Sequence, residues 1–320
     1  MEGVSPRRLG ARSAALAILG VALFGASAAL GAPVATTLDV GASVRFDDNH
    51  SNSLDSRDRE ADEVYRVEAL LFRPPGRGAD DRLSIDAMLG VEKFGDFDDL
   101  DRVDFAVGAS LALLPGTGYG APSLEIGLRG EVRNHRDSRI RDGALGTAFL
   151  RSSVRLTDRL SVSGLADFTQ RTAPNGQVFD TRVGRLVARA ELALAGSDRL
   201  WLEARGTTGD LTANVATSAD RVFPIAEALE VDEAFGAGLL QDGPGPGPGP
   251  GPGPGPGPLG GNRLVYRLDG ESAAVSAGWV RSLGSMTTVE ASVGYRRAWA
   301  DDGVDYDNLT LSLFLLHRLQ

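Results

Sequence analysis

The chain has 320 residues, a formal net charge of −10 at pH 7 and no cysteine. The missing cysteines exclude disulfides, thiolate metal sites and a lipid anchor on an N-terminal cysteine. The negative charge argues against a nucleic-acid partner, and a chain of this length can bury its backbone without covalent staples.

The N-terminus is predicted to be a secretory signal peptide. A pair of arginines precedes an apolar run at 14–24, which is too short for a comfortable membrane helix, and a small-residue cleavage motif ends at Ala28. An uncleaved N-terminal anchor is the alternative. We therefore expect a signal peptide at 1–28 and one domain at 29–320.

Segments with a period of two recur along this domain. In one of them, Leu83, Ile85 and Ala87 alternate with Ser84 and Asp86. Successive side chains of a strand point to opposite faces, so each segment has one apolar and one mostly polar face. The twelve expected strands lie near residues 36–48, 64–73, 82–94, 103–114, 123–135, 144–157, 159–171, 183–195, 199–210, 264–283, 286–299 and 306–319.

The last segment shows the pattern most clearly, with Leu309, Leu311, Leu313 and Leu315 on one face. Strands of about ten residues with charges along the second face fit a membrane barrel better than a soluble β-sandwich, whose strands are shorter. In lipid no backbone amide can stay unpaired, so the sheet must close. We expect an all-β protein, a transmembrane antiparallel up-and-down β-barrel of about 12 strands, in the outer membrane of a Gram-negative bacterium.

The connections between strands alternate between short turns and longer polar links. Because barrels of this kind keep short turns in the periplasm, the link at 211–263 is expected to be a long extracellular loop. It contains a Gly-Pro repeat at 243–258, which predicts an extended spacer. The repeat is either a projecting or ligand-binding loop or a tolerated expansion at a loop tip. The segment at 223–231 before it has the composition of one short helix.

Enzyme and metal chemistry are disfavoured. Barrel-wall hydrolases need a serine and a histidine on one face, but His50 and Ser51 are adjacent and so point to opposite faces of a strand. Aspartates cluster at 96–104 and 301–307 without the glycine of an EF-hand, which favours a solvated acidic rim over a calcium site. We predict no catalytic residue, no metal and no cofactor.

Aromatic residues near the ends of the expected strands are predicted to form girdles at the two membrane interfaces. These residues are Tyr65, Phe72, Phe94, Phe105, Trp279, Tyr295, Trp299 and Tyr306.

Charged residues on the fifth to eighth strands form the candidate functional site, because charged rings set ion preference in channels. The lumen and selectivity candidates are Arg129, Arg133, Arg151, Arg155, Arg171, Arg185, Arg189, Glu125, Glu131 and Glu191. They form either an arginine track that favours anionic solutes or a salt-bridge network that fills a narrow barrel. The sequence leaves both alternatives open.

The first strand ends in Phe46-Asp47-Asp48-Asn49, and the last begins with Tyr306-Asp307-Asn308. In these residues the chain resembles outer-membrane β-barrel porins of the type linked to exopolysaccharide or exosortase loci. The resemblance and the arginine track together predict a passive or weakly selective channel, for anionic saccharides or linked to exopolysaccharide export. The partners expected are outer-membrane lipids, lipopolysaccharide, saccharide solutes and the barrel-assembly machinery. A non-conducting structural or assembly barrel is the alternative, and a barrel-wall hydrolase the third.

Overall fold

A computed structural model of the protein describes residues 36–53, 59–74, 82–113, 120–216, 228–231, 234, 263–300 and 305–319. The predicted signal peptide at 1–28 and the Gly-Pro repeat at 243–258 lie outside these residues. Within the described ranges, no helix is long and apolar enough to cross a bilayer.

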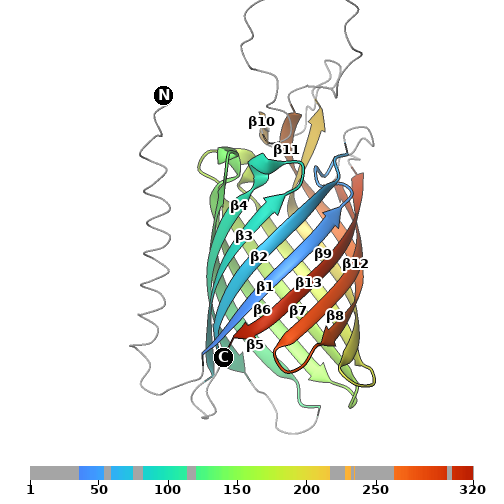
Figure 1. Ribbon diagram of the computed structural model, residues 1–320. Helices are drawn as coiled ribbons and strands as arrows, with labels where there is room; N and C mark the ends of the chain where they lie inside the picture. The colour runs from blue at the N-terminus through green and yellow to red at the C-terminus, as the bar shows by residue number, and fades with distance from the viewer. Residues whose placement is uncertain are drawn as a thin grey trace, which may run out of the picture. The chain divides into compact units, whose positions relative to one another are not determined.

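The described part of the chain consists of antiparallel strands and three short 3-10 helices (Figure 1). The strands are β1 (Thr37–Asp47), β2 (Asp62–Arg73), β3 (Leu83–Phe94), β4 (Arg102–Leu113), β5 (Ser123–His135), β6 (Gly143–Arg155), β7 (Leu160–Thr172), β8 (Arg182–Ala193), β9 (Asp198–Ala216), β10 (Ala228–Val231), β11 (Arg263–Ser282), β12 (Thr287–Ala300) and β13 (Asp305–Leu319). The helices are η1 (Asp98–Leu100), η2 (Arg139–Arg141) and η3 (Gln177–Phe179).

All of these strands except β10 close into a twelve-stranded barrel, as the sequence predicts. Strands that are neighbours in the chain pair with one another, β9 pairs directly with β11, and β13 pairs with β1. In Figure 1 this last pairing places the blue first strand beside the red last strand. The closed ladder leaves no sheet edge in contact with lipid.

The expected loop at 211–263 is partly strand, which corrects the prediction. β9 continues to Ala216 because β11 extends alongside it and pairs with it as far as Arg263. The expected short helix at 223–231 is also wrong for its last four residues, which form β10. β12 pairs with β11 only from Gly270 onward, so β10 takes the hydrogen bonds that the free edge of β11 would otherwise leave unmade.

The apolar face of each barrel strand points outward and the charged face inward. Arg66 of β2 reaches Asp104 of β4 across β3, a contact that only the concave side of the wall allows. On the opposite face of the wall, Leu309, Leu311 and Leu313 are between 39% and 49% exposed, as expected for side chains that contact lipid.

The predicted aromatic girdle is only partly right. Tyr65, Tyr295 and Trp299 are exposed on the outer face near the strand ends, where a girdle residue belongs. Phe94 and Tyr306 are instead buried on the inner side, because their strand positions have the opposite parity.

One end of the barrel carries a group of segments that we call the cap. Its members are the loops at 48–53, 95–101, 136–142 and 173–181, β10, and the paired segments 210–216 of β9 and 263–269 of β11. We call these two paired segments the β9–β11 extension.

The cap has its own apolar core, with the β9–β11 extension at the centre. On one face of this extension, Tyr266 is fully buried against Ala298 and Tyr306 of the barrel wall. On the other face, Val265 packs against Phe179 of η3. The extension is therefore held between the wall and the neighbouring loop.

Hydrogen bonds join the separate pieces of the cap. Asn214 Nδ2 donates to the Ser51 carbonyl at 2.9 Å, which ties β9 to the first loop. Arg267 Nη1 donates to the Gln177 carbonyl at 3.0 Å, and Gln177 N donates to Glu230 Oε1 at 2.8 Å. These bonds link β9, β10, β11 and two loops into one unit.

The two motifs that carry the family resemblance meet beside the cap, where β1 pairs with β13. Asn308 Nδ2 donates to Asp47 Oδ1 at 3.2 Å, and Asn49 Nδ2 donates to the Asp307 carbonyl at 2.9 Å. Asn49 is fully buried, and its Oδ1 accepts a hydrogen bond from Ser53 N at 2.9 Å. The motif residues thus clasp the first strand of the barrel to the last.

We expect Asn49→Ala to weaken this clasp by about 2 kcal/mol, because buried backbone groups lose their hydrogen-bond partners. The urea midpoint of unfolding in lipid vesicles, followed by heat-modifiable gel mobility, measures the change. Asn134→Ala, the same substitution at an exposed asparagine, is the matched control. Equal midpoints for the two variants would show that the clasp does not stabilise the barrel.

Candidate functional site

The residues predicted for the lumen all lie on the inner face of β5–β8. The register gives this face to Glu125, Arg129, Arg133 and Glu131 of β5, Arg151 and Arg155 of β6, Arg171 of β7, and Arg185, Arg189 and Glu191 of β8.

Most of these arginines have a carboxylate partner. The ion pairs within the predicted set are Arg133–Glu131 at 2.5 Å, Arg151–Glu125 at 3.1 Å and Arg189–Glu191 at 2.9 Å. The guanidinium of Arg155 donates to the Asp158 carbonyl at 3.0 Å. The guanidinium of Arg171 stacks on the ring of Phe179 in the cap.

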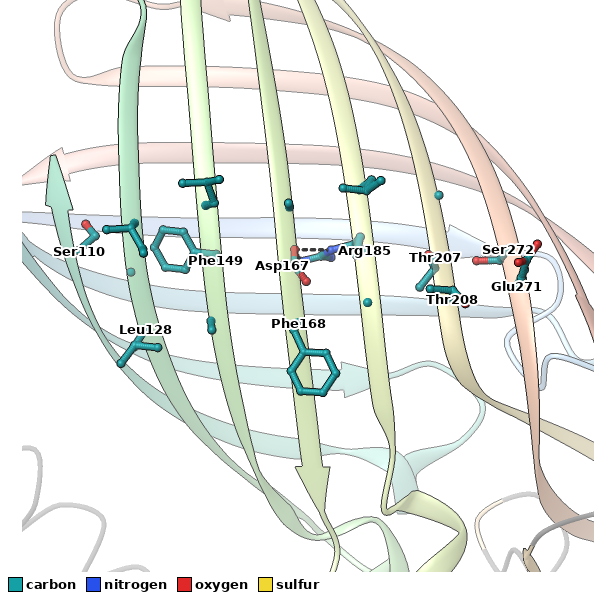
Figure 2. Close-up of a pocket in the computed structure, with 18 of the residues that line it drawn as sticks. Ser110, Leu128, Phe149, Asp167, Phe168, Arg185, Thr207, Thr208, Glu271 and Ser272 are labelled. Atoms are coloured by element: carbon teal, nitrogen blue, oxygen red, sulfur yellow. Dashed lines mark hydrogen bonds and ion pairs between the residues drawn. The ribbon is translucent and has the colours of Figure 1, made fainter. Parts of the chain in front are cut away.

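Two other arginines of the set pair with aspartates that also lie on the inner face. Arg129 lies 3.3 Å from Asp86, two strands away, and Arg185 lies 2.7 Å from Asp167 on the neighbouring strand. Figure 2 shows the Arg185–Asp167 pair bridging β7 and β8. These inner-face pairs join residues of the same, adjacent or next-but-one strands, so they run along the wall and leave the middle of the lumen to solvent.

Water reaches the inner face in the middle of the barrel. The side chains of Arg129, Arg151, Arg185 and Arg205 all point inward, yet between 32% and 55% of their surface is exposed. A barrel filled by its own side chains would bury these groups. The exposure therefore favours an open lumen lined by paired charges.

The strongest cluster of inner charges surrounds Arg66, and the sequence analysis did not place its Glu92, Arg102 and Asp104 in the lumen. Arg66 contacts Glu68 at 2.7 Å, Glu92 at 2.9 Å and Asp104 at 2.7 Å, and Glu92 also pairs with Arg102. Asp104 had been grouped with the acidic loop at 96–104. It belongs instead to the inner face of β4. Asp104 and Arg102 both occupy even-numbered positions of this strand, and that shared alternation could have assigned Asp104 to the same face as Arg102.

Glycines make this cluster possible. Gly90 lies between Arg66 and Asp104, and a Cβ there would be 2.5 Å from Arg66 Nη2. Gly108 is similarly placed between Asp86 and Arg129, where a Cβ would be 2.3 Å from Asp86 Oδ1. Each glycine leaves a gap in the inner face through which a long side chain reaches over one strand.

The inner charges divide between two parts of the wall. Among the described residues, β1–β4 carry more acids than bases: Asp39, Asp47, Asp62, Glu68, Asp86, Glu92 and Asp104 against Arg45, Arg66 and Arg102. β5–β9 carry more bases: Arg129, Arg133, Arg151, Arg155, Arg171, Arg185, Arg189, Arg199 and Arg205 against Glu125, Glu131, Asp167, Glu191 and Glu203. An anionic solute would meet its attractive surface on β5–β9.

The residues weighed for hydrolysis have other contacts. Ser51 Oγ donates to Asn49 Oδ1 at 3.3 Å, and His50 packs against Phe94. A hydrogen-bonded pair of Thr287 Oγ1 and His317 Nδ1, 2.9 Å apart, lies on the outer wall. The next register partner of His317 is Val40, which supplies no acid to such a pair.

A hollow of about 1120 Å³ lies on the outer face of β4–β9 and β11 rather than in the lumen. Most of its lining is apolar and outward-facing, including Leu128 and Phe168, which Figure 2 labels. Inward residues such as Asp167 border it only because they are next to the outward ones in the chain. This hollow is a surface for lipid and is separate from the charged lumen.

His50 is a titratable group within the cap. Its ring centroid lies 5.1 Å from that of Phe94. Burial, followed by the nearby positive charges of Arg141, Arg45 and Arg102, lowers the pKa of His50 to about 3. His50 is therefore neutral at the pH where a free histidine begins to protonate.

No protein-family model matches the chain, and no curated protein matches it in sequence. Solved structures do match. An outer-membrane channel from Pseudomonas putida F1 is 11% identical with a TM-score of 0.52, covering 90% of this chain and 97% of its own. A KdgM porin in complex with disordered oligogalacturonate is 8% identical, with a TM-score of 0.47 and coverage of 88% and 99%. The outer-membrane phospholipase of Salmonella typhi is 7% identical, with a TM-score of 0.41 and coverage of 88% and 90%.

At these identities the likeness concerns the fold. The neighbours are mainly porins and channels, with one phospholipase among them. The protein is an outer-membrane β-barrel with a porin-like architecture, and its location is the outer membrane.

We expect Gly90→Ala to displace Arg66 from Asp104 and to destabilise the barrel by about 2 kcal/mol, since Asp104 is left buried with a weakened partner. Gly130→Ala is the control, because a Cβ there has nothing within 4 Å. Urea unfolding in vesicles, followed by tryptophan fluorescence, compares the two. A Gly90→Ala barrel as stable as the control would contradict the role given to the glycine gap.

Acid should loosen the first loop of the cap. The folded-state pKa of His50 lies below its usual value of 6.5, so its contribution is complete above pH 6.5 and declines as the pH falls toward 3. Hydrogen exchange of a peptide covering 48–53, measured at pH 7.5 and 5.0 and corrected for intrinsic rates, should show reduced protection at pH 5.0. His50→Gln should lose most of this pH dependence. An unchanged dependence in the variant would assign the effect to other groups.

Proposed function

We propose that the protein is a weakly selective porin-like channel that passes small anionic solutes, acidic saccharides in particular. The observation that carries the proposal is the exposure of inward arginines midway along the barrel, with ion pairs that follow the wall. The excess of arginine on β5–β9 supplies the preference for anions. We assign the cap to the extracellular end, which places the short turns and the chain termini of the barrel in the periplasm.

A non-conducting structural barrel is the second candidate, and the cap favours it. The β9–β11 extension is packed between the wall and the η3 loop, and its core side chains are fully buried. A cap that never opens would block solutes even though the lumen below it is hydrated. The two candidates share one barrel and differ in whether the cap admits a path.

We also propose a link to exopolysaccharide export. It rests on the motif from Phe46 to Asn49, and Asp47 and Asn49 have a structural explanation in the clasp between β1 and β13. Lipopolysaccharide around the barrel and the assembly machinery acting on β13 are the other partners that we propose.

Conductance in planar bilayers tests the proposal. The refolded mature chain should give reproducible current steps with a preference for anions over cations. Replacing Arg151 and Arg185 by Gln should shift the reversal potential toward cations, because each change removes a water-exposed positive charge from the lumen. A correctly folded barrel that gives no steps would exclude the channel and favour the structural barrel.

A further inference from the structure

The ring of Phe149 lies among the charged residues of the inner face, in the middle of β6. Its register partners are Gly127 of β5 and Asp167 of β7. It therefore shares the inner face with Arg151 and Arg185. A Cβ on Gly127 would be 2.3 Å from Cζ of Phe149, so the ring covers this glycine. Figure 2 shows the ring face-on between β5 and β6, which means that it lies flat along the wall.

The other face of the Phe149 ring is turned to the lumen. The side chain is half-buried, and the guanidinium carbon of Arg151 lies 5.6 Å from the ring centroid. Trp201 of β9 shows the contrasting arrangement. Its ring covers Gly278, but Arg189 lies 4.3 Å from its centroid and the residue is only 8% exposed. Trp201 therefore has both faces in contact with the wall, whereas Phe149 keeps an apolar face that a solute can reach.

Charged groups border this apolar face. Arg151 pairs with Glu125 at 3.1 Å, and its side chain is 55% exposed. On the other side of the ring, Asp167 and Arg185 form an ion pair at 2.7 Å. A pyranose sugar has C–H groups on its faces and hydroxyl groups at its edge. An aromatic face bordered by hydrogen-bonding groups is complementary to both parts of such a ring.

We propose that Phe149 and Arg151 form a saccharide subsite in the lumen, with a sugar ring stacked on Phe149 and its acidic substituent at Arg151. The inference rests on the proposed function and adds to it. Exposed arginines attract any small anion, whereas an aromatic face selects solutes that have an apolar ring face. The class of ligand is a pyranose that carries a carboxylate, and a hydroxyl group of the same sugar donates to Glu125.

Isothermal titration calorimetry on the refolded, detergent-solubilised protein tests the subsite with two anions. Trigalacturonate carries its carboxylates on pyranose rings, and citrate carries as many carboxylates without a ring. The wild-type protein should bind trigalacturonate more tightly than citrate. We expect Phe149→Leu to weaken trigalacturonate binding about fivefold and to leave citrate binding unchanged, because leucine is apolar but has no flat face.

Two further variants separate the ring from the charge. Phe168→Leu is the matched control, because Phe168 lies on the neighbouring strand with its side chain exposed on the outer face. It should change the binding of neither probe. Arg151→Gln should weaken the binding of both probes, since it removes a water-exposed positive charge that each carboxylate would meet.

Equal trigalacturonate affinity in Phe149→Leu and Phe168→Leu would overturn the subsite. An equal loss of both probes in Phe149→Leu would also overturn it, because the ring would then serve only to hold the charged wall in place. Heat-modifiable mobility checks that each variant is folded. If Phe149→Leu does not fold, saturation-transfer NMR on the wild-type barrel still provides a test. Irradiation of the aromatic protons should transfer magnetisation to the C–H protons of trigalacturonate and not to those of citrate, and equal transfer would overturn the subsite.

Conductance distinguishes a failure of the subsite from a failure of the channel. A barrel that conducts with a preference for anions, yet binds trigalacturonate no more tightly than citrate, would contradict only the subsite. A barrel that binds trigalacturonate through Phe149, yet gives no current steps, would contradict only the channel.

Discussion

Backbone pairing in a medium without water is the constraint on which this structure depends. Every strand that faces lipid must have its amides satisfied on both edges, and only a closed ladder achieves this. The pairing of β13 with β1 closes the ladder, and the clasp around Asn49 reinforces the same seam from the side chains. The constraint also acts above the barrel rim, where β10 covers the edge of β11 that β12 leaves open.

Closure divides the side chains into two populations with different requirements. Outward residues need only be apolar, and their identity is loosely set. Inward residues share a confined space, so the position of a small residue decides which charges can meet. Gly90 and Gly108 are the clearest cases, since each lets an arginine reach an acid over one strand. Much of the inner charge pattern therefore stabilises the wall, and in the proposed channel the water-exposed arginines in the middle are the charges that a solute would meet.

The period-two pattern predicted the barrel strands well because alternation is a local property of the sequence. Thr310 and Ser312 could be placed inside simply because the leucines between them face out. The pairing of Arg66 with Asp104 could not be predicted in the same way, since it depends on a glycine in the strand between them. β10 was missed for a related reason: Ala228–Val231 is helical by composition, and only an open edge on β11 makes it a strand.

The cap and the lumen below it differ in packing and in access to water. Below the cap, charges are largely paired along the wall, so the lumen offers a solute modest attraction and little obstruction. Within the cap, Arg141 and Arg171 stack on Phe179, and the β9–β11 extension is packed between the barrel wall and the η3 loop. In the channel that we propose, passage therefore depends on the packed cap, and the water-exposed arginines of β5–β8 act on a solute only after it has entered the lumen.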